Sequence, residues 1–120
     1  VALISFKGRG VFKGWTEESL QAYVDYALEE SEGGVRLKCH TKIEAKIFGS
    51  YPKRLWSSLT KMITPCHIAV ASKSFPFVRQ STETLSKLSA YSSVDVAGGH
   101  CFMQEDPVHI AGLIKHYFLD

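Results

Sequence analysis

The most informative stretch of the sequence is YSSVDVAGGHCFMQEDP, residues 91–107. Its first six residues have the length and composition of a strand, and a glycine pair then marks a turn. His100 follows this turn directly, and Asp106 is a suitable N-cap for a helix whose first residue is a proline. Open α/β proteins bind ligands beyond the carboxyl ends of their strands, and this order of elements predicts that position for His100.

The residues upstream give the second half of the chain the order strand, helix, strand, helix. CHIAVA, residues 66–71, is a compact apolar run that suits a strand buried on both faces of a parallel sheet. We expect a loop over 72–76, a helix over about 78–88 and a second strand over 91–96. The last helix is expected to bury one face, which carries Ile110, Leu113, Ile114, Tyr117 and Phe118. This alternation predicts an α/β fold with parallel strands joined by right-handed crossovers. Two strands make a poor sheet, so we expect more strands from residues outside this chain or from another copy.

The first half is expected to be mainly helical. Thr16 is a plausible N-cap, and acidic residues follow it where a helix N-terminus favours them. The apolar face of this helix is expected to carry Leu20, Tyr23, Val24, Ala27 and Leu28. A glycine pair at 33–34 should end the helix, and a short strand over 35–39 should follow. We expect helices over about 41–48 and 53–62. Residues 1–14 are expected to be a loop or the remnant of an element that began upstream.

Gly98-Gly99-His100, apolar Phe102-Met103 and Glu105-Asp106-Pro107 resemble the end of α/β-hydrolase-fold proteins. There a strand, Gly-Gly-His, two or three apolar residues and Glu-x-Pro precede the last helix. Residues 12–24, 34–39 and 44–48 look like the cap segment of one branch of that family.

The resemblance covers about residues 11–119. It implies the C-terminal part of an α/β-hydrolase fold, with parallel strands flanked by helices and part of a helical cap, incomplete on its own. Residues 1–62 would be a cap-like helical segment with one short strand, and residues 63–120 the last core strands and helices.

The resemblance also implies an activity. His100 would be the catalytic general base of an esterase-like serine hydrolase acting on a small carbonyl or ester substrate, with no cofactor and no metal. Its partner would be the N-terminal part of the hydrolase domain, or another chain that completes the sheet.

Two parts of the catalytic machinery are missing from this sequence. It contains no Gly-x-Ser-x-Gly elbow to expose a nucleophilic serine, and Gly49-Ser50-Tyr51 follows an expected helix rather than a strand. No carboxylate occurs in 72–77, where many members of the family carry the acid that orients the histidine. Either the acid lies upstream, as in members that carry it one strand earlier, or the triad is broken. Glu83 lies too far into the next helix, and Asp95 lies within a strand. The alternative is therefore a catalytically inactive, hydrolase-like structural or interaction subunit of a larger assembly, joined through an open sheet edge.

Other candidate sites have weaker support. Ser58 and Lys61 match a Ser-x-x-Lys pattern that lacks its companion motifs. Cysteine and histidine are neighbours at 39–40, 66–67 and 100–101, but neighbours on a strand point to opposite faces and the spacing does not resemble a zinc site.

Composition narrows the class of protein. The length of 120 residues suits one ordinary domain. The formal net charge is only +2 and the basic residues are scattered along the sequence, so we expect no nucleic-acid partner. No apolar run approaches the length of a transmembrane helix. The beginning VALISFK does not resemble a signal peptide and reads like a cut in a longer chain. Three dispersed cysteines favour a reducing, intracellular compartment, cytoplasmic or organellar.

Overall fold

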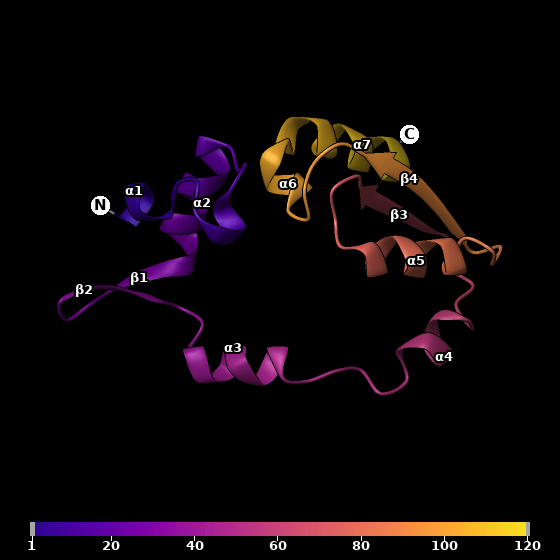
Figure 1. Ribbon diagram of the computed structural model, residues 1–120, viewed down its shortest axis with the longest axis horizontal. Helices are drawn as coiled ribbons and strands as arrows, with labels where there is room; N and C mark the ends of the chain where they lie inside the picture. The colour runs from indigo at the N-terminus through magenta and orange to yellow at the C-terminus, as the bar shows by residue number, and fades with distance from the viewer. Residues whose placement is uncertain (1, 120) are drawn as a thin grey trace. The chain divides into compact units, whose positions relative to one another are not determined.

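The computed structural model describes residues 2–119, which divide into two units between Lys53 and Arg54 (Figure 1). Both helices and strands are present, so the expected α/β class is confirmed at that level.

The C-terminal unit is built on two parallel strands. β3 (Cys66–Ala71) and β4 (Tyr91–Val96) have the bounds that the sequence predicts, and they pair in register from Cys66 opposite Tyr91 to Ala71 opposite Val96. α5 (Pro76–Leu85) is the crossover between them. It begins two residues earlier than expected, because Pro76 is accommodated in the first turn, where its missing N–H has no helical partner.

Helices cover both faces of this small sheet. α5 packs on β3, while α7 (Pro107–Leu119) packs on the other face. The core joins Ala71 and Val96 of the strands to Ile110 of α7. Side chains alternate across a strand, so Ala69 and Ala71 face α7 while Val70 lies on the α5 side. A short helix, α6 (Phe102–Glu105), precedes α7.

The expected buried face of α7 is only partly formed. Ile110 is buried and Leu113 and Tyr117 are half-buried, but Ile114 is 53% exposed and Phe118 is 77% exposed. The prediction was therefore wrong for Ile114 and Phe118. A sheet of two strands is narrow, so it buries less of the surface of α7 than a wider sheet would.

The N-terminal boundary of this unit lies upstream of the expected division at 62 and 63. α4 (Leu55–Leu59), shorter than the expected helix over 53–62, belongs to the C-terminal unit. The hydroxyl of Tyr91, at the start of β4, donates to the carbonyl oxygen of Leu59 at 2.7 Å and attaches α4 to the sheet.

The N-terminal unit has short helices where a loop or the remnant of an element was expected. These are α1 (Ala2–Phe6) and the 3-10 helix η1 (Gly10–Phe12). They bring aromatic rings against α2 (Glu17–Ala27), whose N-terminus is capped by Thr16 as predicted, with Oγ1 accepting from the backbone N–H of Ser19 at 3.2 Å. The rings in mutual contact are those of Phe6, Phe12, Trp15 and Tyr23. Contacts between these rings give the first residues a structure that their local sequence does not predict.

A β-hairpin replaces the end of the expected helix and the single expected strand. β1 (Leu28–Ser31) pairs antiparallel with β2 (Gly34–Leu37). Gly33 has a φ of 85° in the turn between them, a conformation that glycine adopts without strain. The glycine pair therefore turns a hairpin rather than ending α2. α3 (Thr41–Phe48) follows with the expected bounds and is capped by His40.

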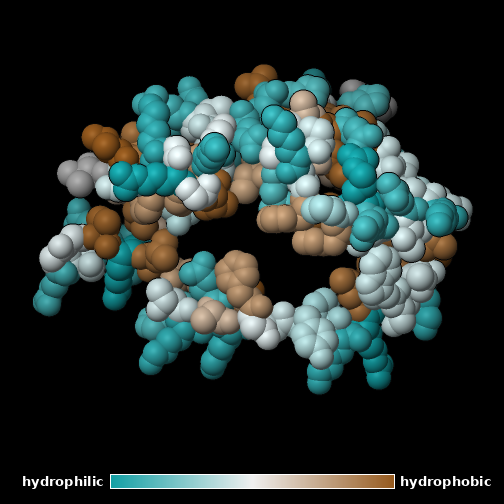
Figure 2. Space-filling view, in the orientation of Figure 1, coloured by the Kyte–Doolittle hydropathy of each residue, from teal (hydrophilic) through white to brown (hydrophobic). Residues whose placement is uncertain are grey.

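Large apolar side chains are exposed along residues 43–63, which include α3 and α4. These are Ile43, Ile47, Phe48, Tyr51, Leu55, Trp56 and Ile63. Figure 2 shows hydrophobic side chains lying among hydrophilic ones at the surface.

Candidate functional site

His100 lies just beyond the carboxyl end of β4, as predicted, and its side chain is exposed. The turn before it is held by Glu105 of α6, whose Oε2 accepts from the backbone N–H of Gly99 at 2.8 Å. A Cβ atom on Gly99 would lie 2.5 Å from Oε1 of Glu105, and Gly98 has a φ of 125°. The φ of Gly98 favours glycine at that position, whereas a side chain on Gly99 would have to displace the carboxylate of Glu105.

The loop after β3 brings a hydroxyl group to His100. Oγ of Ser74 and Nδ1 of His100 are 2.9 Å apart. Two backbone hydrogen bonds join this loop to the end of β4: Ser72 N–H donates to the carbonyl oxygen of Val96 at 2.9 Å, and Lys73 N–H donates to that of Gly98 at 3.0 Å. The two loops that carry Ser74 and His100 are thus extensions of the paired strands.

The ring of Phe75 lies beside the imidazole ring of His100. Its ring centroid lies 4.7 Å from that of His100, with the planes inclined by 55°. Phe75 is the residue directly before α5, and it also stacks on Phe77. The imidazole ring is therefore held at Nδ1 by a hydrogen bond and against an aromatic ring.

This arrangement suits a histidine that acts as a base. Nδ1 is occupied, and among residues 2–119 the only hydrogen-bond partner that the structure gives the ring is Ser74, so Nε2 is available to a substrate or to another group. The Ser74 hydroxyl can orient the ring, but it cannot stabilise an imidazolium ion as a carboxylate does. Ser74 was not among the site residues predicted from the sequence, because its contact with His100 depends on the pairing of β3 with β4.

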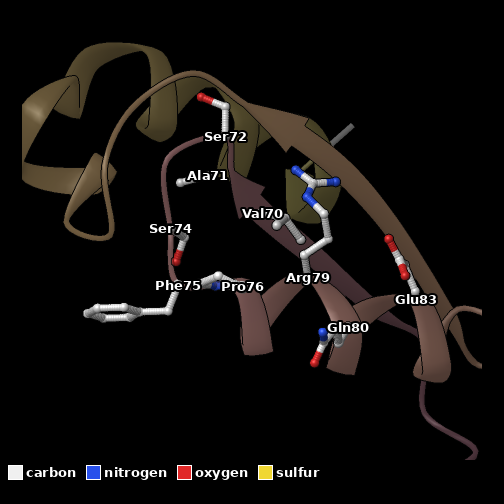
Figure 3. A pocket seen from close by; sticks show the side chains of 9 residues that line it. All are labelled: Val70, Ala71, Ser72, Ser74, Phe75, Pro76, Arg79, Gln80 and Glu83. Carbon is white, nitrogen blue, oxygen red and sulfur yellow. The ribbon is translucent and has the colours of Figure 1, made fainter.

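A pocket of about 360 Å³, lined by both polar and apolar side chains, lies on the α5 side of β3 (Figure 3). Its lining residues are Val70, Ala71, Ser72, Ser74, Phe75, Pro76, Arg79, Gln80 and Glu83. Ser74 borders both this pocket and His100. Within the pocket Arg79 extends from α5 and pairs with Asp95 of β4 at 2.7 Å. The hydrogen bond and the charge of Asp95 raise the pKa of Arg79 above its ordinary value.

Asp95 and Glu83, the two carboxylates nearest to the expected position of the acid in the sequence, do not contact His100. Asp95 is paired with Arg79 and its side chain is 71% exposed, while Glu83 lies in the helix and lines the pocket. No carboxylate of residues 2–119 is hydrogen-bonded to the His100 ring.

The remaining candidates stay separate from the His100 site. His67 stacks on Tyr117 with a centroid distance of 4.2 Å and is hydrogen-bonded to Ser92. Ser58 and Lys61 are exposed. Cys39, Cys66 and Cys101 are free thiols. Within the described part of the chain, no three His, Cys, Asp or Glu side chains are grouped so that they could hold a metal ion, and none of the helices has the length and apolar character needed to cross a membrane.

Comparison of the chain with protein-family models, with curated proteins and with solved structures finds no match.

Proposed function

We propose that this chain is the C-terminal part of an esterase-like serine hydrolase with an α/β-hydrolase fold, and that His100 is its general base. The observation that carries the proposal is the exposed imidazole beyond β4, bonded at Nδ1 and open at Nε2. The turn braced by Glu105 and the helices on both faces of a parallel sheet also support it.

In this proposal His100 first accepts a proton from the nucleophile and then donates it to the leaving group. The hydroxyl of a serine outside this chain attacks the carbonyl carbon of an ester, and its proton passes to Nε2 of His100. When the tetrahedral intermediate collapses, the imidazolium returns that proton to the departing alkoxide, and the acyl group remains on the serine. Water then replaces the serine hydroxyl in the same two steps and releases the carboxylic acid.

Labelling with a fluorophosphonate probe tests the role of His100. The protein is purified under native conditions as the wild type, His100→Ala and His109→Ala. His109 is the matched control, because it is also an exposed histidine in the C-terminal unit. We expect a labelled serine, and His100→Ala should slow its labelling by about 10²- to 10⁴-fold, the usual contribution of a general base. Equal labelling rates in all three proteins, or no labelling of the wild type, would contradict the proposal.

A second function is favoured by the open sheet: a catalytically inactive subunit that binds a partner through its strands. Among the described residues β3 pairs only with β4, so the outer edge of each strand is unpaired. Unpaired strand edges present N–H and C=O groups that bind another strand. Native mass spectrometry distinguishes the two functions: a co-purifying chain together with an unlabelled sample favours the subunit, and a labelled serine favours the hydrolase.

A further inference from the structure

The hydrogen bond between Ser74 and His100 joins residues that lie 26 positions apart in the sequence. Several backbone hydrogen bonds hold the loop that carries Ser74. The turn before Ser74 is closed by its own N–H, which donates to the carbonyl oxygen of Ala71 at 3.0 Å. The loop is joined to the end of β4 by the backbone bonds of Ser72 and Lys73. Contacts of this kind hold a side chain in a defined position, as a positioning group requires.

Because the hydrogen bond is made at Nδ1, it influences whether the other nitrogen, Nε2, carries a proton. A neutral imidazole has one N–H donor and one acceptor nitrogen, and the partner of one nitrogen selects the state of the other. A serine hydroxyl can either donate or accept. When Oγ of Ser74 accepts from Nδ1–H, Nε2 is a bare acceptor that can take a proton. When the hydroxyl donates to Nδ1, Nε2 carries hydrogen and His100 cannot act as a base there.

We infer that Ser74 is a positioning residue that accepts a hydrogen bond from Nδ1–H of His100 and keeps Nε2 bare and basic. The Ser74 hydroxyl would orient the ring as a carboxylate does in a catalytic triad. Because the hydroxyl is neutral, it fixes the tautomer and the direction of the ring without adding a charge. The ring of Phe75 contacts the same imidazole ring. The effect of Ser74 on catalysis rests on the proposed function. Which nitrogen of the His100 ring carries the proton is a property of this chain that can be measured without any activity.

Nitrogen-15 NMR of the histidine side chains tests the inference without any activity assay. Spectra are recorded at a pH of about 9, where histidine side chains are generally neutral, and the His100 signals are assigned by their loss in His100→Ala. In the wild type we expect the proton on Nδ1. In Ser74→Ala we expect it to move mainly to Nε2, the form that an imidazole side chain prefers in water.

Two further variants separate the hydroxyl group from general structural effects. Ser74→Thr keeps a hydroxyl and should restore the Nδ1–H form. Ser89→Ala is the matched control, because Ser89 is exposed and lies in the connection between α5 and β4. It should leave the His100 spectrum unchanged. A wild type with the proton on Nε2, or the same proton position in the wild type and Ser74→Ala, would overturn the inference.

The labelling assay distinguishes failure of the Ser74 inference from failure of the hydrolase proposal. Ser74→Ala should slow labelling about fivefold to tenfold, the effect of losing one neutral hydrogen bond, and Ser74→Thr should recover the rate. A rate that depends on His100 but not on the Ser74 hydroxyl would contradict the inference and leave the hydrolase proposal intact. A tautomer that responds to Ser74 while labelling is independent of His100 would support the inference and contradict the hydrolase proposal.

Discussion

Glu105 determines the shape of the turn that carries His100. Its carboxylate accepts from Gly99 N–H at 2.8 Å, and it occupies the space that a side chain on Gly99 would need. The turn and the acid therefore depend on each other, although they belong to different elements.

This dependence predicts a non-additive pair of substitutions. Gly99→Ala should push the carboxylate aside and break the hydrogen bond, and Glu105→Ala should remove the same bond. Each should lower the free energy of unfolding by about 1.5 to 3 kcal/mol, the range for hydrogen bonds to charged groups. The double variant should lose little more than either single variant. Urea denaturation measures all three, and additive losses would show that the two residues act separately.

Gly112 provides the matched control for this cycle. It lies inside α7, and a Cβ on it would meet nothing within 4 Å. Gly112→Ala should therefore stabilise the unit, by about 0.5 to 1 kcal/mol, because alanine loses less backbone entropy in a helix.

Tyr91 predicts how the stability of the C-terminal unit changes with pH. Burial raises the pKa of its phenol above the ordinary value of 10.0, and the Cys66 thiol raises it further. The folded state therefore favours the protonated phenol, which also donates to Leu59. This stabilisation should be fully present below a pH of about 10, where the phenol of an unfolded chain is also protonated. It should be lost as the pH rises through the raised pKa.

The check is a comparison of Tyr91→Phe with the wild type by urea denaturation between pH 8 and pH 11. The variant should be less stable at pH 8, because the Leu59 carbonyl loses its donor, and its stability should fall less at high pH. Tyr26→Phe is the control, since Tyr26 is 77% exposed. Parallel pH profiles for Tyr91→Phe and the wild type would contradict this account.

At the scale of elements, one edge of β3 pairs with β4, and its other edge has no partner strand among residues 2–119. The N–H groups of Cys66 and Ser72 donate toward β4, to the carbonyl oxygens of Ala90 and Val96. Because backbone groups alternate along a strand, the N–H of Val70 also points to β4, whereas that of Ala69 points to the open edge.

A proline scan of β3 distinguishes the two edges. Ala69→Pro should keep the β3–β4 ladder and weaken pairing of a further strand at the open edge of β3, because proline removes only an outward N–H. Val70→Pro should remove a ladder hydrogen bond and unfold the unit. Circular dichroism measures folding, and native mass spectrometry measures association. An Ala69→Pro protein that associates as strongly as the wild type would show that the open edge of β3 is not the binding surface.

At the scale of the whole molecule, the division between the units predicts where a protease cuts. Residues 50–54 lie outside helices and strands, and Lys53 and Arg54 are both exposed. Exposed connections between compact units are the preferred sites of nicking. Brief trypsin treatment should first release a fragment that begins at residue 54 or 55, as mass spectrometry would show. A first cut at Lys38, an exposed lysine just after β2, would contradict this division.

Elements whose signals are local can be predicted from the sequence. The apolar run at 66–71, the cap Thr16 and the Asp106-Pro107 pair predicted β3 and the starts of α2 and α7, because chain periodicity and capping involve only nearby residues. The position of His100 beyond a strand followed for the same reason. Its catalytic role stays a prediction.

Tertiary structure alone decided the contacts between residues far apart in the chain. Pairing of β1 with β2 shortened α2, and aromatic contacts with Tyr23 gave structure to the first residues. The partner of His100 was decided in the same way: Ser74 reaches it because parallel pairing places the ends of β3 and β4 side by side. Such contacts depend on how elements meet in space, and no local pattern of residues encodes them.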